Sequence, residues 1–442
     1  MNPISRRASL LVATLFVGLL SRSAVAQEAT PMPIPTALQD YVALPDASFA
    51  WTLQGKTENP LGTIYDLELT SQTWHDITWK HVLMVYEPKD LAHKDHVLLF
   101  ITGGGKLNKP KPQDQLLGLE VARLCGSRVA MLHQVPNQPL FENRVEDDLI
   151  TDTFLKYLAT GDKTWPLLFP MVKSAVRAMD AVEQLAVKEW KVPVKGFVVT
   201  GASKRGWTTW LSAVADKRVV AIAPIVIDTL NFPKQTDYQI ETWGKYSEQI
   251  DDYTSKGLIA KMKDDPKIPL WTWVDPFTYR QQLTLPKLII NGTNDRYWTV
   301  DALNNYWSDL EGPKHIRYVP NGGHNLGNGK EGAMRTLGAF VRHTVSGRPL
   351  PKLEWKHSTA GGKYVLTMSA TPAPTAISLW SSASATKDFR QVEWRSQPLN
   401  VENGAATGEV AIPATGHAAL FGEFQFQDGD LEYSLSTQIR RE

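Results

Sequence analysis

The feature that most constrains the fold is an alternation of apolar strands with amphipathic helices in the first half of the chain. The segments 96–102, 128–133 and 197–202 are apolar almost throughout, which is typical of parallel strands covered on both faces. Between them, 113–124 and 166–190 repeat apolar residues at three- and four-residue steps, as amphipathic helices do. This rhythm predicts right-handed crossovers and a mostly parallel sheet with helices on both faces.

Other segments extend this predicted sheet at both ends. Polar and apolar residues alternate at 63–70 and 79–86, which indicates antiparallel strands with one solvated face. The chain after residue 215 supplies the remaining elements: buried strands at 219–227, 287–291 and 315–320, a helix at 300–310 and a closing helix at 331–345.

The strand at 197–202 runs into a sharp turn at Ser203, and a helix begins at Lys204. A serine on such a strand-to-helix bend is the nucleophile elbow of α/β-hydrolases. The backbone N–H of Lys204, at the free end of the helix, could then bind an oxyanion. Arg205 stands where a second small residue is usual. The turn alone therefore fits either a nucleophile or an ordinary helix cap.

Two further loops favour the catalytic interpretation. Asp295 follows the buried strand 287–291 and a glycine, and His324 lies in a glycine-rich loop after the strand 315–320. Each residue alone would be an ordinary loop residue. The order Ser203, Asp295, His324 is the nucleophile–acid–base order of α/β-hydrolases. The sequence therefore predicts a catalytic triad at one edge of the sheet.

Residues on the same edge are candidate partners of a substrate. Gly103, Gly104 and Gly105 follow the strand 96–102, where α/β-hydrolases place the second oxyanion donor; a plain turn is the alternative. We expect Gly104 and Gly105 to supply this donor. No Gly-Lys-Ser/Thr follows, so a phosphate loop is excluded. Gln134 begins the next loop on this edge and is a candidate substrate contact.

Residues 229–283 break the strand–helix rhythm and are rich in aromatic side chains. Insertions after this strand commonly form a lid in α/β-hydrolases, and an aromatic lid would shape a pocket and exclude water. Trp271 and Trp273 are candidate substrate contacts there. The alternative is that these aromatic side chains simply pack the insertion onto the sheet.

The first 26 residues predict a secretory signal peptide. Two arginines precede the apolar run 10–20, and small residues lead to a cleavage site before Gln27. The route is left open between general secretion and twin-arginine export. The apolar run is too short for a membrane span, and we expect export to the periplasm or the medium. Cys125 is the only cysteine, so no intramolecular disulfide can form.

Composition excludes several functions. The formal net charge of the chain is +1, which gives no field to attract nucleic acid. No histidine spacing typical of a metal site accompanies the acidic residues, and no metal or organic cofactor is implied. The cluster Glu146–Asp148 is interpreted as a solvated helix N-terminus. The oligomeric state is left open.

These patterns divide the chain into five parts. Residues 1–26 are the signal peptide, and 27–47 an exposed lead-in. The α/β domain spans 48–345, and 346–353 is a linker rich in glycine and proline. Residues 354–442 form a small all-β domain, expected to be a sandwich. Its expected strands are short and alternating: 364–369, 376–380, 391–395, 408–412, 418–426 and 432–439.

Four motifs carry a resemblance to a known family. The stretches 201–207, 291–298, 320–324 and 387–390 resemble those of the PhoPQ-activated pathogenicity-related proteins over essentially the whole mature chain. The resemblance implies an α/β-hydrolase-like fold and an association with bacterial virulence and resistance to cationic antimicrobial peptides, but no chemical substrate. The turn also resembles the elbow of glucuronoyl esterases, in which a basic residue, here Lys204, follows the serine.

These observations together indicate an exported serine hydrolase. Ser203 would attack an ester or amide carbonyl, with His324 as base and Asp295 orienting the imidazole. The side chain of Lys204 or Arg205 could hold a substrate carboxylate, although a simple ion pair fits equally well. A carboxylic ester is the expected substrate class. A serine aminopeptidase or dipeptidyl peptidase, acting on a peptide, and a non-catalytic protein that kept the fold are the alternatives.

Overall fold

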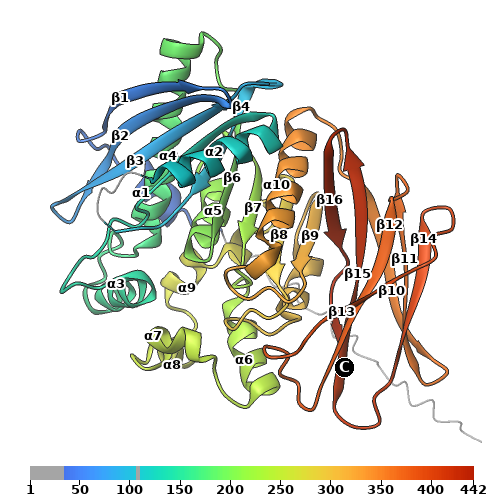
Figure 1. Ribbon diagram of the computed structural model, residues 1–442. Coiled ribbons are helices and arrows are strands. Elements are labelled where there is room, and N and C mark those ends of the chain that lie inside the picture. Colours follow the sequence, from blue (N-terminus) through green and yellow to red (C-terminus); the bar gives the residue numbers. More distant parts are fainter. Residues whose placement is uncertain (1–33, 106–109) are drawn as a thin grey trace, which may run out of the picture. The chain divides into compact units, whose positions relative to one another are not determined.

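A nine-stranded mixed sheet forms the centre of the computed structural model, which describes residues 34–105 and 110–442 (Figure 1). In sheet order the strands are β1 (Ala50–Asn59), β2 (Gly62–Trp74), β3 (Ile77–Pro88), β5 (Ser127–Leu132), β4 (His93–Ile101), β6 (Gly196–Ala202), β7 (Val219–Ile225), β8 (Lys287–Gly292) and β9 (Lys314–Val319). Strands β1 to β3 are antiparallel, and all neighbours from β5 to β9 are parallel. The predicted α/β-hydrolase fold is confirmed.

Burial along the strands follows the sequence pattern. Every residue of β5 and of β8 is buried, whereas β1 at the sheet edge alternates between exposed and half-buried positions. An apolar run that is covered on both faces gains burial at every residue, so it can only lie inside the sheet. Strand β2 alternates between buried and half-buried positions, but β3 is buried at nearly every position from Trp79 to Tyr86, so the solvated face expected there is not present.

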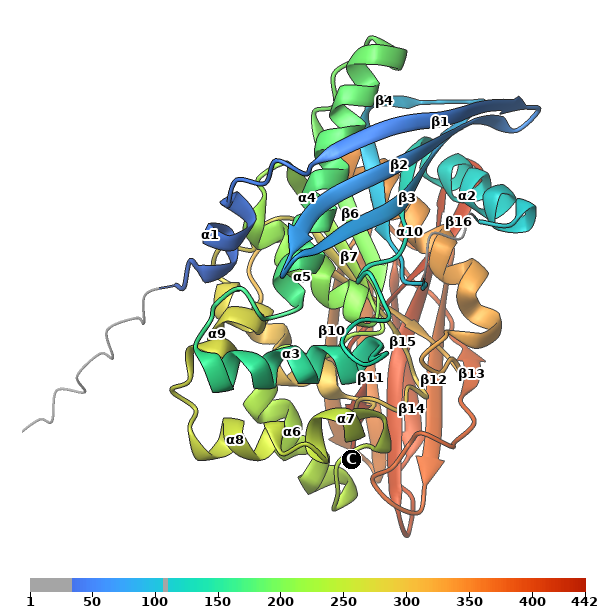
Figure 2. The same ribbon diagram turned by 90° about the vertical axis from the view of Figure 1, so that its left-hand side faces the viewer.

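Helices cover both faces of the sheet (Figure 2). The pair α2 (Pro112–Cys125) and α10 (Lys330–Val345) packs together on one face. The pair α4 (Leu168–Leu185) and α5 (Lys204–Ala215) packs together on the other, and α4 continues into a π-helical turn, Ala186–Trp190. The helices expected at 113–124, 166–190 and 331–345 are therefore confirmed.

Two segments differ from expectation. The expected exposed lead-in contains a helix, α1 (Ala37–Ala43), whose Leu38 and Tyr41 are buried against α4. The expected helix at 300–310 is replaced by two short 3-10 turns, Ala302–Asn305 and Trp307–Asp309. Asparagine side chains in this segment bond to distant groups, among them Asn305 to Gln235, and this competes with a regular helix. The predicted signal peptide lies outside the described residues.

The aromatic insertion folds into four short helices, α6 (Phe232–Trp243), α7 (Asp251–Thr254), α8 (Leu258–Asp264) and α9 (Pro269–Val274). It leaves the sheet after β7 and returns at β8. Helix α3 (Glu146–Thr160), which follows β5, contacts α7. These helices gather beside the carboxyl ends of the parallel strands (Figure 1).

The C-terminal part forms two antiparallel sheets, as predicted. One has the order β10 (Lys352–Ala360), β11 (Lys363–Thr371) and β14 (Ala405–Ala411). The other has the order β13 (Arg395–Pro398), β12 (Ala376–Ser384), β15 (His417–Asp428) and β16 (Leu431–Ser436), with β17 (Arg440–Arg441) paired to β15. Strand β10 begins inside the expected linker, and β13 begins where the strand expected at 391–395 ends.

This β domain packs against β9 and α10. Arg317 of β9 forms an ion pair with Glu423 of β15, and both side chains are largely buried. The backbone N–H of Tyr318 donates to the Ser436 hydroxyl at 3.0 Å. One hydrophobic core includes residues of the central sheet, α10 and β15, so the β domain stabilises the site-bearing sheet. None of the helices in the described ranges is both long and apolar enough to cross a membrane.

Candidate functional site

Ser203 lies on a strained turn between β6 and α5. Its backbone angles are φ 59° and ψ −128°, a region in which a residue with a side chain typically costs about 1–3 kcal/mol. The turn is held because the Ser203 N–H donates to the carbonyl of Ile225 at 2.8 Å, and its carbonyl accepts from the N–H of Trp207 at 3.0 Å. The serine therefore stands out from the end of the sheet at a rigid bend, as the elbow pattern predicted.

Glycines make this bend possible. A Cβ at Gly201 would lie 2.7 Å from the carbonyl oxygen of Arg205, and a Cβ at Gly206 would lie 2.6 Å from the Ile227 side chain. Helix α5 therefore approaches β6 and β7 more closely than any side chain permits. The second close approach occurs at Gly206, one position later than in the usual motif, which is why a large residue is tolerated at Arg205.

The predicted acid and base lie side by side. His324 Nδ1 and Asp295 Oδ2 are 2.8 Å apart, and the aspartate side chain is 8 % exposed. The other carboxylate oxygen of Asp295 accepts from the backbone N–H of Tyr297 at 2.9 Å. The Tyr297 ring packs against the imidazole with ring centres 4.2 Å apart. Because Nδ1 is engaged, Nε2 is the ring nitrogen that remains for proton transfer.

Ser203 and His324 line one cavity. Lys204 and Trp207 of α5 form part of its wall, and the lid supplies much of the rest.

Strained backbone gathers at this end of the sheet. Four non-glycine residues with positive φ closely follow four strands: Gln134 (56°), Ser203 (59°), Val226 (49°) and Asn321 (57°). For a β-branched residue such as Val226 this is an outlier. Strain of this kind persists where the surroundings enforce it, and it clusters at functional sites.

The two basic residues after Ser203 share one carboxylate. Glu146 of α3 lies 2.7 Å from Lys204 Nζ and accepts two hydrogen bonds from Arg205, at 2.7 and 2.8 Å. Burial alone would raise the pKa of Glu146, but the hydrogen bonds and charges of Arg205 and Lys204 prevail and lower it well below its usual range. Arg205 also donates to the Val135 carbonyl at 2.5 Å. Its guanidinium lies where a side chain at Gly103 would be.

The acidic cluster Glu146–Asp148 was therefore wrongly interpreted as a solvated helix end. Asp147 lies in the wall of the cavity, 3.4 Å from Lys204 Nζ. The hydroxyls of Tyr253 and Tyr297 donate to it at 2.8 and 3.3 Å. Two basic residues directly after the elbow need acidic partners when buried, and this requirement was the sequence signal that could have located the cluster.

Of the four residues predicted to contact the substrate, one lines the cavity and three are bound to other protein groups. Trp271 lines the cavity. Trp273 packs its ring against those of Tyr157 and Phe169, with centres 5.1 and 6.2 Å away. The Gln134 side-chain oxygen accepts from the Val82 N–H at 2.9 Å, and Arg205 is held by Glu146. These three side chains are thus bound to protein groups.

The expected oxyanion donors lie at two places on the same edge. Lys204 is the first residue of α5 and belongs to the cavity wall, and its backbone N–H is one of those that an α-helix leaves without an internal partner. Gly104 and Gly105 follow β4, and the φ of 109° at Gly104 favours glycine. The lack of side chains leaves the backbone at this turn accessible.

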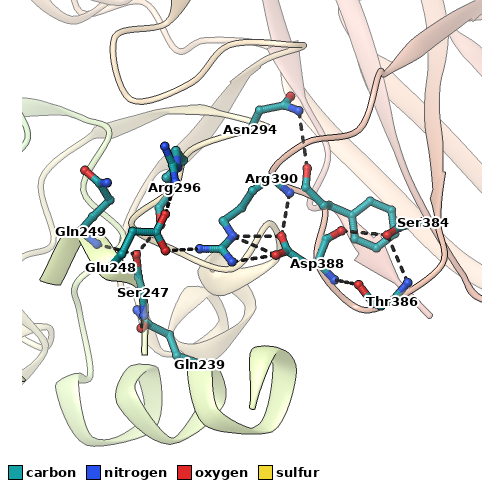
Figure 3. A network of polar contacts seen from close by, with 11 residues as sticks. Gln239, Ser247, Glu248, Gln249, Asn294, Arg296, Ser384, Thr386, Asp388 and Arg390 are labelled. Atoms are coloured by element: carbon teal, nitrogen blue, oxygen red, sulfur yellow. Dashed lines mark hydrogen bonds and ion pairs between the residues drawn. The ribbon is translucent and has the colours of Figure 1, made fainter. Parts of the chain in front are cut away.

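A loop of the β domain reaches the lid and the Asp295 loop (Figure 3). Arg390 donates to Glu248 at 3.0 Å and is held in place by Asp388. The guanidinium of Arg390 also lies over the ring of Trp243, 4.1 Å from its centre. Glu248 is bonded in turn to Arg296, directly after Asp295. The β domain therefore braces the lid from one side.

The same loop also holds the two loops that carry Asp295 and His324. Asn294, directly before Asp295, donates to the Val392 carbonyl at 2.7 Å. Asn321 exchanges two hydrogen bonds with the backbone of Trp394, at 2.7 and 2.9 Å. These contacts fix the positions of the loops that follow β8 and β9 and carry Asp295 and His324. They also keep residues 391–394 out of a regular strand.

Within residues 34–105 and 110–442, no group of three or more histidine, cysteine, aspartate or glutamate side chains is arranged to hold a metal ion.

The fold and this site define a class: α/β-hydrolase-fold proteins in which an elbow serine shares one cavity with a histidine that is bonded to an aspartate. Within it, the chain belongs to the PhoPQ-activated pathogenicity-related protein family, whose profile matches residues 38–390. The sequence is 33% identical over 377 residues to the autocrine proliferation repressor protein A of Dictyostelium discoideum, covering 80% of this chain and 76% of that protein.

Likenesses to solved structures are weaker. An acetyl xylan esterase from Paenibacillus sp. R4 has a TM-score of 0.49 and 15% identity, covering 70% of this chain and 92% of that one. A glucuronoyl esterase from Solibacter usitatus has a TM-score of 0.43 and 14% identity, covering 70% of this chain and 91% of that one. The family assignment rests on the sequence relatives.

Proposed function

We propose that the protein is an exported serine hydrolase that cleaves a carboxylic ester. The observation that carries the proposal is the shared cavity: a serine on a strained elbow and a histidine bonded to a buried aspartate both line it. Such an arrangement of nucleophile, base and orienting acid is recognised by geometry rather than by sequence position.

In this proposal the Ser203 hydroxyl attacks the ester carbonyl and its proton passes to His324 Nε2. Asp295, bonded to Nδ1, holds the imidazole in the required tautomer and stabilises the imidazolium. The developing oxyanion is bound by the N–H of Lys204 and by one from Gly104 or Gly105, each typically worth about 10²–10³ in rate. The proton then goes to the leaving alcohol, and water hydrolyses the acyl-serine in the same way.

The charged groups next to Ser203 are assigned supporting roles. Glu146 and Asp147 together balance the charges of Lys204 and Arg205, so these two basic side chains position the elbow and leave no spare charge for a substrate carboxylate. Family membership and the N-terminal signal pattern support a role outside the cytoplasm. The name of the Dictyostelium relative describes an effect on cells and leaves the chemistry of this site open.

The test is turnover of p-nitrophenyl esters by the purified mature chain and its variants. Ser203→Ala and His324→Ala should each abolish turnover. Ser203→Ala should leave the melting temperature within about 2 °C, whereas His324→Ala also removes the hydrogen-bond partner of Asp295 and should lower it somewhat more. Ser255→Ala, at an exposed position, and His343→Ala, at a half-buried one, change residues that do not line the cavity; they are the matched controls and should keep full activity. Substantial turnover by Ser203→Ala would remove that residue from its role.

A further inference from the structure

The wall of the cavity beside Ser203 is mainly apolar. Besides Ser203 and His324, its wall is formed mainly by large apolar side chains from α3, α5, the lid and the loops around them, among them Phe154, Trp207, Ile227, Phe232, Ile250 and Trp271. Most of these side chains are themselves buried. The lid thus completes an apolar wall next to the nucleophile.

Two polar side chains of the wall, Gln235 and Thr236, are engaged by protein groups. The Gln235 amide donates to the Ala302 carbonyl and accepts from Asn305, both at 3.0 Å. Thr236 donates to the Pro233 carbonyl at 3.0 Å.

The charged groups of the wall are engaged as well. Asp147 is bonded to Tyr253 and Tyr297 and lies beside Lys204. Glu146 faces the same lysine. A charged ligand would therefore have to break existing ion pairs, and a polar one would find few open partners. An apolar ligand loses nothing on entering and gains by leaving water.

Resting on the proposed function, we infer that the substrate is an ester of an uncharged, apolar acyl group longer than acetyl, which lies against the apolar wall of this cavity. The acyl carbon bonds to Ser203 Oγ as the bond to the alcohol oxygen breaks, and the leaving alcohol takes the proton from His324. Water then releases the fatty acid and restores the serine hydroxyl, so no further reactant is needed. The acyl group, unlike the alcohol, occupies the cavity in both steps.

The test compares two ester series on the mature wild-type chain. In the p-nitrophenyl series from acetate to decanoate, kcat/KM should rise about tenfold or more by hexanoate or octanoate, because each buried CH₂ adds to transition-state binding. In the alkyl acetate series it should stay nearly constant. A maximum at acetate, a preference for the charged succinyl ester, or a rise only with alkyl length would overturn the inference.

Two substitutions sharpen the test. Ile250→Trp, which narrows the cavity, should move the preferred acyl group toward acetate; Trp271→Ala, which widens it, should move the preference toward longer chains. Ile240→Trp, at an exposed position of the lid helix α6, is the control and should leave the preference unchanged. An unchanged preference in both cavity variants, with melting temperatures showing that they fold, would refute the inference.

The two proposals fail in different ways. Covalent labelling of Ser203 by a fluorophosphonate, together with ester turnover that does not favour apolar acyl groups, overturns this inference and leaves the hydrolase proposal intact. Absence of both labelling and turnover overturns both.

Discussion

Replacing Glu146 by glutamine tests how the elbow is supported. The carboxylate faces both Lys204 and Arg205, whose side chains are only 7 % and 10 % exposed. Glutamine keeps the shape but removes the charge, so two nearly buried cations lose their shared partner. Lys204 would keep Asp147, at 3.4 Å, and Arg205 would keep the Val135 carbonyl.

The expected loss of stability in Glu146→Gln depends on how deeply the ion pair is buried. Removing one member of a fully buried ion pair typically costs about 3–5 kcal/mol. The Glu146 side chain is 37 % exposed, so water screens part of the loss and we expect about 2 kcal/mol. With an unfolding entropy of about 2.1 cal/mol/K per residue, this corresponds to a fall in melting temperature of about 2–3 °C for a chain of this length. Because the elbow carries Ser203, kcat/KM should also fall about tenfold.

The pH dependence supplies an independent check. The pKa of Glu146 is lower in the folded chain than its ordinary value, so its contribution is complete above the ordinary glutamate pKa and is lost as the pH falls toward the folded value. The difference in melting temperature between wild type and Glu146→Gln should therefore be constant from about pH 6 to 8 and shrink below about pH 4.5.

The measurement is a melting curve by fluorescence at each pH, with ester turnover at pH 7. Glu142→Gln is the matched control, because this neighbouring carboxylate is 87 % exposed and lies 3.6 Å from Arg144; it should change neither quantity. Equal melting temperatures for wild type and Glu146→Gln at neutral pH, or an equal loss in the Glu142→Gln control, would refute the reasoning.

Two other predictions concern residues outside the triad. Burial raises the pKa of Asp228 from its ordinary value to about 7. Between about pH 4 and pH 7 this carboxyl is ionised in the unfolded chain but protonated in the folded one, so wild-type stability should decline as the pH rises through that interval and level off above it. In Asp228→Asn the decline should be smaller, and an identical pH slope in the two melting series would contradict the prediction. Arg390→Ala removes the contacts of the β domain with Glu248 and Trp243. It should raise the KM for an ester substrate about two- to tenfold, the effect of losing about 0.5–1.5 kcal/mol. The exposed control Arg395→Ala should leave KM unchanged, and equal KM values in the two variants would count against a bracing role.

Much of this architecture could be predicted because its signals are local. Apolar runs such as 96–102 have only one way to bury every side chain, and glycines around Ser203 indicate a tight approach of helix to strand. The adjacency of Asp295 and His324 followed from both loops leaving the same sheet edge. Their hydrogen bond is present in the structure, while their roles in catalysis stay predictions.

The features that escaped prediction depend on contacts between distant residues. Helix α1 is buried because Tyr41 packs against Phe169, which no local pattern announces. Glu146 belongs to the elbow through partners 59 residues away. Arg390 braces the lid through Glu248, 142 residues away. Such pairings depend on how the chain folds back on itself, whereas periodicity reports only on neighbours in the sequence.

The most direct test of the central claim is the mass of the protein after exposure to a fluorophosphonate under native conditions, followed by peptide mapping. A nucleophile activated by His324 reacts with this reagent, whereas an ordinary helix-cap serine does not. We expect one adduct, located on Ser203, which is lost in His324→Ala and strongly reduced in Asp295→Asn. An unmodified protein, or an adduct on another residue, would contradict the account.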